Sequence, residues 1–257
     1  MLDLGSDDYF GHRNRACADL RRSPYRLLRR GRLRRHLFSP DVLARARDDP
    51  GEAASFLFML ATAVIWIGSI DGAREILKER AVGVAPGAYL GSKVAVLFAL
   101  ATVQTLVLVL VTLGLRRLHE PPETYLLVAA LLTVTGWTAV GHGLLISALA
   151  RSEDQATSAI PVSLIPQLLF AGAIVPLAEA SGVVEVVAGA VLARWSFAAT
   201  GTAVDLNGRL AAEPGAAAAT GYGTAFFDLP AVAGVGAMAV LLAVVLAGTW
   251  AALRDRP

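Results

Sequence analysis

The stretch VAVLFALATVQTLVLVLVTLGL, residues 94–115, decides the fold class of this chain. It contains no charged residue, and its polar side chains are threonines and one glutamine, Gln104. A helix rises about 1.5 Å per residue, so about 20 such residues cross the hydrocarbon core of a bilayer, roughly 30 Å thick. A soluble helix has an apolar stripe on one face, whereas this segment is apolar all round. It therefore predicts a membrane-spanning α-helix.

Four further stretches have the same character, and together they predict an all-α, polytopic transmembrane bundle with five spans. Inside a bilayer only helices and closed barrels satisfy every backbone group, and barrel strands would be shorter and would alternate. The stretch 183–200 is too short to span, which predicts a re-entrant or interfacial element with Trp195 at the headgroups. The four further predicted spans are 54–70, 125–150, 156–178 and 230–253.

Composition supports the membrane class and sets the N-terminal segment apart. Hydrophobic residues make up 55% of the 257 residues, the mean hydropathy is +0.57 and the formal net charge is +2. Cys17 is the only cysteine, which excludes an intrachain disulfide and a thiolate metal cluster. Residues 1–50 hold twelve arginines and no apolar stretch of a signal peptide. We expect 1–50 to be an Arg-rich, poorly ordered segment, either a solvated tail or a basic surface, and 51–257 to form the transmembrane domain.

The distribution of charge predicts how the chain crosses the membrane. Basic residues in short loops mark the cytoplasmic side, which places 71–93 and the C-terminus inside and the acidic stretch 179–229 outside. A single span at 54–70 would then leave the Arg-rich N-terminus outside, against the same rule. The sequence therefore indicates either that a span is missing before residue 54 or that 54–70 fails to cross.

Few polar residues lie within the predicted spans, and none of them is Asp, Glu, Lys or Arg. Gln104, His142 and Gln167 are candidates for lining a translocation path. Pro166, one of three prolines in 156–178, predicts a bent helix with loosened backbone bonds beside Gln167. The alternatives are a kinked packing helix and a hydrogen-bonded packing histidine. The spans offer no nucleophile–base pair, so we expect no catalytic residue and no metal site.

A charged segment, DGAREILKER at residues 71–80, separates the first two predicted spans. Its charges recur three or four residues apart, which favours a short amphipathic helix. Such a cytoplasmic helix can transmit force from a soluble partner, or it is an ordinary solvated turn. Residues 87–93 have the wrong spacing for a phosphate-binding loop. We therefore expect no cofactor on this chain, and ATP with Mg²⁺ on a partner.

In their order along the chain, these motifs resemble the membrane domain of type-2 ATP-binding-cassette transporters, specifically the G-subfamily-like (White-type) permeases. The resemblance covers about Trp66 to Ala199 and is carried by Trp66, REILKER at 74–80, GLLISAL at 143–149, IPQLLFAG at 165–172 and RWS at 194–196.

The resemblance implies a six-helix membrane domain, whose first span is apparently absent here. It implies pairing with a second copy or a homologous permease, and with nucleotide-binding ATPase subunits. It also implies that the charged segment couples to ATP hydrolysis through five residues, Arg74, Glu75, Lys78, Glu79 and Arg80.

The sequence thus predicts a multi-pass permease subunit of an ATP-driven exporter in the plasma membrane. It would move a lipid-like or hydrophobic substrate by alternating access, with membrane lipid but no nucleic acid among its partners. The alternatives are a degenerate or truncated permease fragment that only anchors, and an intramembrane enzyme.

Overall fold

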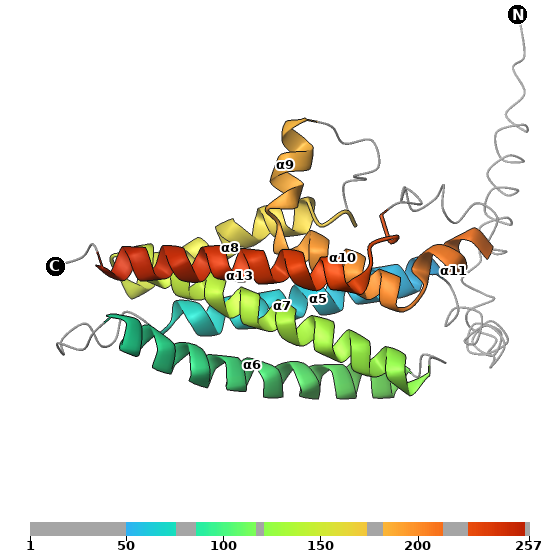
Figure 1. Ribbon diagram of the computed structural model, residues 1–257, viewed down its shortest axis with the longest axis horizontal. Helices are drawn as coiled ribbons and strands as arrows, with labels where there is room; N and C mark the ends of the chain where they lie inside the picture. The colour runs from blue at the N-terminus through green and yellow to red at the C-terminus, as the bar shows by residue number, and fades with distance from the viewer. Residues whose placement is uncertain (1–49, 76–85, 117–120, 174–181, 213–225, 255–257) are drawn as a thin grey trace, which may run out of the picture. The chain divides into compact units, whose positions relative to one another are not determined.

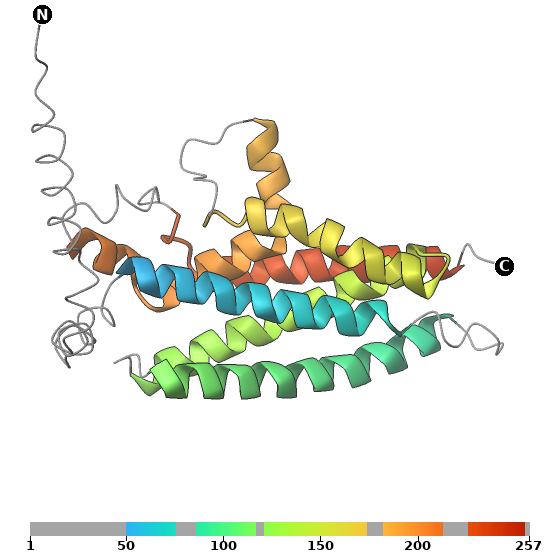
Figure 2. The same ribbon diagram turned by 180° about the vertical axis from the view of Figure 1, so that it is seen from behind.

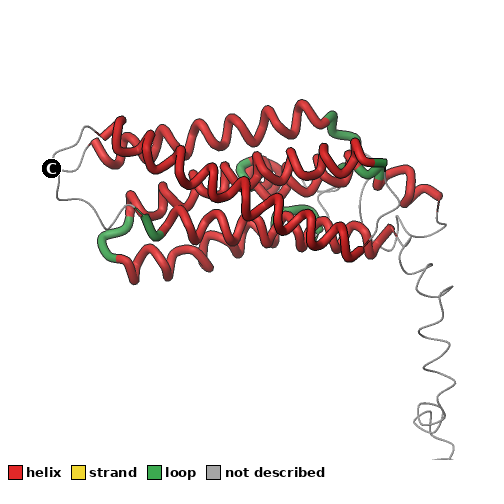
Figure 3. The backbone as a smooth tube through the Cα atoms, turned by 90° about the horizontal axis from the view of Figure 1, so that it is seen from below, coloured by secondary structure: helices red, strands yellow, loops and turns green. Residues whose placement is uncertain are grey.

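The computed structural model describes residues 50–75, 86–116, 121–173, 182–212 and 226–254, and the regular elements in these ranges are all α-helices. This confirms the predicted all-α class. Figure 1 labels the helices, and Figure 3 colours the same backbone by secondary structure. The helices are α5 (Pro50–Ala73), α6 (Pro86–Arg116), α7 (Pro122–Leu149), α8 (Glu153–Leu169), α9 (Val183–Gly189), α10 (Leu192–Ala203), α11 (Leu206–Ala212) and α13 (Ala231–Arg254).

The Arg-rich segment, apart from residue 50, lies outside the described residues. Its expected poor order and the expectation of a further span before residue 54 therefore stay predictions. The same holds for the sidedness derived from loop charges.

Four of the five predicted spans are helices long and apolar enough to cross a membrane. They have 23, 26, 28 and 24 residues. Their large apolar side chains are exposed along α6 and α13 in particular, as expected for helices that face lipid. The four spans are Gly51–Ala73, Gly87–Thr112, Pro122–Leu149 and Ala231–Arg254.

The fifth predicted span, 156–178, is wrong in its extent. Its helix, α8, has 17 residues and ends at Leu169. Phe170 closes it, and Gly172 adopts a positive φ of 95°, a conformation that few residues other than glycine tolerate. The apolar composition continues through this point, so hydropathy alone could not show where the helix stops. At about 1.5 Å per residue, α8 is slightly shorter than the bilayer core.

The predicted re-entrant element is a pair of helices, α9 and α10, bent by 75° at a short break. Figure 1 shows α9 projecting from the bundle while α10 lies within it. The indole N–H of Trp195 donates to the carbonyl oxygen of Gly189 at 2.8 Å, so it fixes the bend between the two helices. Phe197 on α10 is fully buried and contacts the rings of Phe58, Phe226 and Phe227.

The most extensive helix packing is between α5 and α7, and Figure 2 shows α5 at the front of the bundle. Gly72 lies so close to α7 that a Cβ there would overlap the carbonyl oxygen of Val140, and a Cβ on Gly143 would overlap that of Ser69. A Cβ on Gly68 would lie 2.9 Å from the carbonyl oxygen of Gly136. Membrane helices associate through such small residues because lipid provides no hydrophobic force between them.

Candidate functional site

The predicted coupling segment begins where α5 ends. Asp71 belongs to the last turn of α5, so the expectation of a separate helix starting at Asp71 is wrong for its first residues. Arg74 and Glu75 form a turn in which the Glu75 amide donates to the carbonyl oxygen of Gly72 at 3.4 Å. Arg74 is exposed. The remaining coupling candidates, Lys78, Glu79 and Arg80, lie outside the described residues.

An ion pair joins this turn to the next span. The Lys93 ammonium on α6 lies 3.1 Å from a carboxylate oxygen of Glu75, and the two side chains are 22% and 37% exposed. Such a half-exposed pair contributes no more than about 1 kcal/mol to stability. Its geometric effect is to hold the turn against the start of α6.

A second polar contact lies one turn further back along α5. The amide nitrogen of Gln104 on α6 donates to a carboxylate oxygen of Asp71 at 2.9 Å. The predicted span 54–70 ends one residue before Asp71, but α5 continues to Ala73, so Asp71 is part of the helix. The sequence contains one signal for this contact. Asp71 lies four residues before Glu75, so in a continuous helix the two side chains lie on the same face, the one toward α6.

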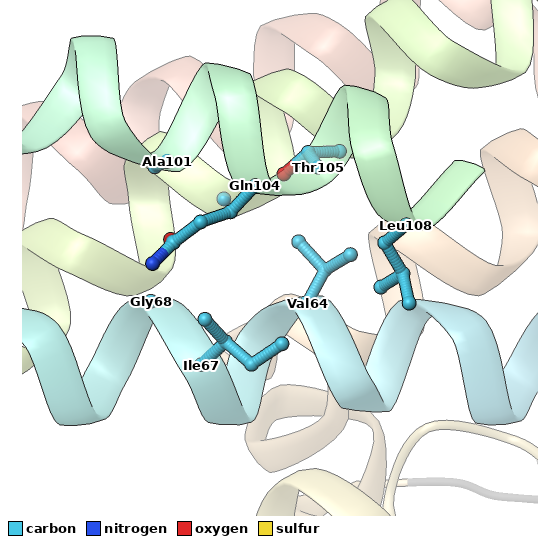
Figure 4. A pocket seen from close by; sticks show the side chains of 8 residues that line it. Val64, Ile67, Gly68, Ala101, Gln104, Thr105 and Leu108 are labelled. Atoms are coloured by element: carbon cyan, nitrogen blue, oxygen red, sulfur yellow. The ribbon is translucent and has the colours of Figure 1, made fainter. Parts of the chain in front are cut away.

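Gln104 also lines a small cavity between α5, α6 and α7. Figure 4 shows its side chain extending from α6 toward Gly68 on α5. The volume is about 10 Å³, close to the minimum for one water molecule. The amide oxygen of Gln104 is buried there and has no hydrogen-bond partner among the described residues. In this conformation, the cavity cannot admit a substrate. Its lining residues are Val64, Ile67, Gly68, Ala101, Gln104, Thr105, Leu108 and Gly136.

His142 lies on α7 and contacts α5. Its Nδ1 is 3.3 Å from the hydroxyl oxygen of Ser69, which in turn lies 3.4 Å from the carbonyl oxygen of Ala139. Ser69 and Asp71 are two residues apart, so they point to different sides of α5. His142 and Gln104 therefore contact different faces of the same helix.

The other two path candidates, Pro166 and Gln167, are on α8. Pro166 is exposed, and its carbonyl oxygen accepts from the Phe170 amide at 2.9 Å. The side-chain oxygen of Gln167 accepts from the backbone amide of Ala193 at 3.0 Å, so it binds α10. The cavity around Gln104 includes none of His142, Pro166 and Gln167. Gln104, His142 and Gln167 thus take part in separate contacts between helices, whereas the bond of Pro166 lies within the end of α8.

Within the ranges that the structure describes, histidine, cysteine, aspartate and glutamate do not cluster in groups of three or more.

Several helices long and apolar enough to span a membrane, the bent pair predicted to be re-entrant, and a charged turn after α5 are typical of a polytopic membrane protein. The chain belongs to the ABC-2 type transporter family, whose sequence model matches residues 34–200. For a multi-pass member of this family the plasma membrane is the typical location.

A relative from Mycobacterium tuberculosis (strain ATCC 25618 / H37Rv) is the ABC transporter ATP-binding/permease protein Rv1747. It is 30% identical to this chain over an alignment of 175 residues, and the match covers 62% of the chain. The match spans only 20% of the relative's length. The resemblance to type-2 ATP-binding-cassette permeases is confirmed by these matches.

Proposed function

We propose that this chain is the membrane-spanning subunit of an ATP-driven exporter, and that a partner ATPase, which binds ATP and Mg²⁺, contacts the turn after α5. Membership of the ABC-2 family and the ATP-binding/permease name of the relative support the proposal. The observation that carries it is the turn itself. Arg74 is exposed at the end of α5, and Glu75 binds Lys93 on α6, so a force on the turn reaches two spans at once.

The proposed substrate is a lipid-like or hydrophobic molecule. The polar side chains on which this rests, Gln104, His142 and Gln167, carry no formal charge at neutral pH, with histidine counted as neutral. The residues that surround Gln104 between α5, α6 and α7 are mostly apolar. A charged substrate would need charged partners inside the bilayer, where isolated charges are costly.

Alternating access requires a second bundle, and we propose a second copy of this chain or a homologous permease. Large apolar side chains are exposed on α5 and α8, namely Met59, Trp66, Val162 and Ile165. A cysteine at Met59 in a Cys17→Ser background tests this pairing. Oxidative cross-linking of two copies would support it. If the cysteine is modified by a lipid-soluble maleimide but never cross-links, this face meets lipid.

The partner is tested by a photo-cross-linker placed at Arg74, with Glu185 on α9 as the matched control on an exposed site. We expect Arg74, but not Glu185, to cross-link to a chain with an ATP-binding cassette. The captured complex is then reconstituted in vesicles that contain a fluorescent phospholipid as probe.

ATP-dependent movement of this phospholipid is the expected result. Cross-linking without movement would indicate a different substrate or the degenerate, anchoring alternative. ATP hydrolysis by the purified chain alone would contradict the assignment of ATP to a partner.

A further inference from the structure

The start of α10 raises a hydrogen-bonding problem. Val191, Leu192 and Ala193 are 5%, 4% and 2% exposed, so this helix begins inside the protein. The first amides of any helix lack a partner within the helix, and a side-chain oxygen at the N-cap normally accepts from one of them. The N-cap residue here is Val191, which has no such oxygen. A buried, unpaired amide in a membrane protein costs several kcal/mol.

Gln167 solves this problem from another helix. Its side-chain oxygen accepts from the amide of Ala193, the second residue of α10, at 3.0 Å across 26 residues of sequence. This is one of the two amides, N2 and N3, that an N-cap serine or aspartate can bind. The cap of α10 is therefore a bond between α8 and α10, and it breaks if the two helices separate.

The two helices that this bond joins differ in stiffness. Pro161 and Pro166 lie inside α8, and each removes a backbone hydrogen bond, so the end of α8 that carries Gln167 can bend. The re-entrant pair is braced internally, because Trp195 donates to Gly189 across the bend. A displacement of α10 at its N-terminus would therefore carry α9 with it.

We infer that Gln167 is a positioning residue that ties the re-entrant pair to α8, so that bending of α8 moves α9 and α10 together. The importance of this tie for transport rests on the proposed function, whereas the tie itself is a property of the bundle. This role differs from lining a translocation path, because the side-chain amide oxygen of Gln167 already accepts a hydrogen bond from α10.

The test distinguishes two roles of Gln167: capping the N-terminus of α10, and holding α10 to α8. Gln167→Met removes the acceptor at similar volume, and Val191→Ser supplies a local N-cap on α10. The double variant thus has a capped α10 without the bond to α8, and Val191→Ser alone is the matched control. Spin labels at Val162→Cys and Val186→Cys, which are 67% and 75% exposed, report the distance between α8 and α9 in a Cys17→Ser full-length chain.

We expect the distribution of distances between the two spin labels to broaden roughly twofold in the double variant, because the local contact between α8 and α10 is lost there. In the control the distribution should stay narrow. Hydrogen exchange of α10 should stay as slow as in the parent. An unchanged distribution in the double variant would overturn the inference and leave Gln167 as a cap alone.

If the double variant fails to insert, Gln167→Asn combined with Val191→Ser must show the same broadening, because the asparagine side chain is one methylene too short to keep the bond while Val191→Ser still caps α10. Phospholipid movement is measured separately on the parent chain. Its absence would count against the proposed function without affecting the tie.

Discussion

Replacing Gly72 by alanine should destabilise the bundle by about 1–3 kcal/mol, the usual cost of overpacking a close contact. A Cβ at this position would lie 2.8 Å from the Leu144 amide nitrogen and 3.0 Å from the Gly143 carbonyl carbon. Both are backbone atoms, so neither can rotate away. Ordinary contacts begin at 3.4 Å, so α5 and α7 must separate. A gap of about 0.5–1 Å forfeits a quarter to a half of the dispersion attraction across it.

Gly91→Ala is the matched control, because Gly91 also lies in a spanning helix but has no atom near its missing Cβ. There alanine should stabilise the helix by about 0.5–1 kcal/mol, through propensity alone. The assay is thermal unfolding in detergent, followed by size-exclusion chromatography with fluorescence detection. If Gly72→Ala unfolds at the same temperature as Gly91→Ala, the inferred backbone contact between α5 and α7 is wrong.

Three further predictions concern single polar contacts. A double-mutant cycle of Asp71→Ala and Gln104→Ala should give a coupling energy of about 0.6 kcal/mol and at most about 1.7, and a value near zero would mean that the two side chains do not bind each other. Lys93→Met should lower stability by less than about 1 kcal/mol through loss of the Glu75 ion pair, with an effect that shrinks in high salt; a salt-independent loss would indicate a packing role instead. Ser152→Ala should cost about 1 kcal/mol, because the hydroxyl oxygen accepts from the Gln155 amide at the start of α8, and faster hydrogen exchange in the first turn of α8 should accompany the loss.

The spans could be predicted because a run of about 20 apolar residues has few alternatives to a membrane helix. Their ends were harder to predict. Asp71 was assigned to a loop because it is charged, yet the helix continues through it and Gln104 accommodates it. α8 ends at Leu169, and the positive φ of Gly172 shortly after it leaves no trace in hydropathy.

The candidate site was harder to predict from sequence than the spans were. Its residues bind partners on other helices, and the sequence does not show which residues are partners. Gln167 was interpreted as part of a path because it is polar within an apolar span. Its partner, the Ala193 amide, is a backbone group that no residue type marks. One signal could have been used. No Ser, Thr, Asp or Asn stands at the N-cap position before the buried helix start at Leu192, so the first amides of α10 need a hydrogen-bond acceptor from another part of the chain.

The glycine contact between α5 and α7 also has a consequence for biosynthesis. Ser69 and Ala139, which meet across it, are 70 residues apart. At a synthesis rate of about 5–20 residues per second, roughly 4–14 s pass between the synthesis of the α5 contact residues and that of their partners on α7. During that interval its small-residue face needs a temporary cover, which the insertion machinery or lipid must provide. A variant that slows the pairing of these two helices should therefore reduce yield in cells more than its effect on the finished protein suggests, because quality control acts on the waiting intermediate.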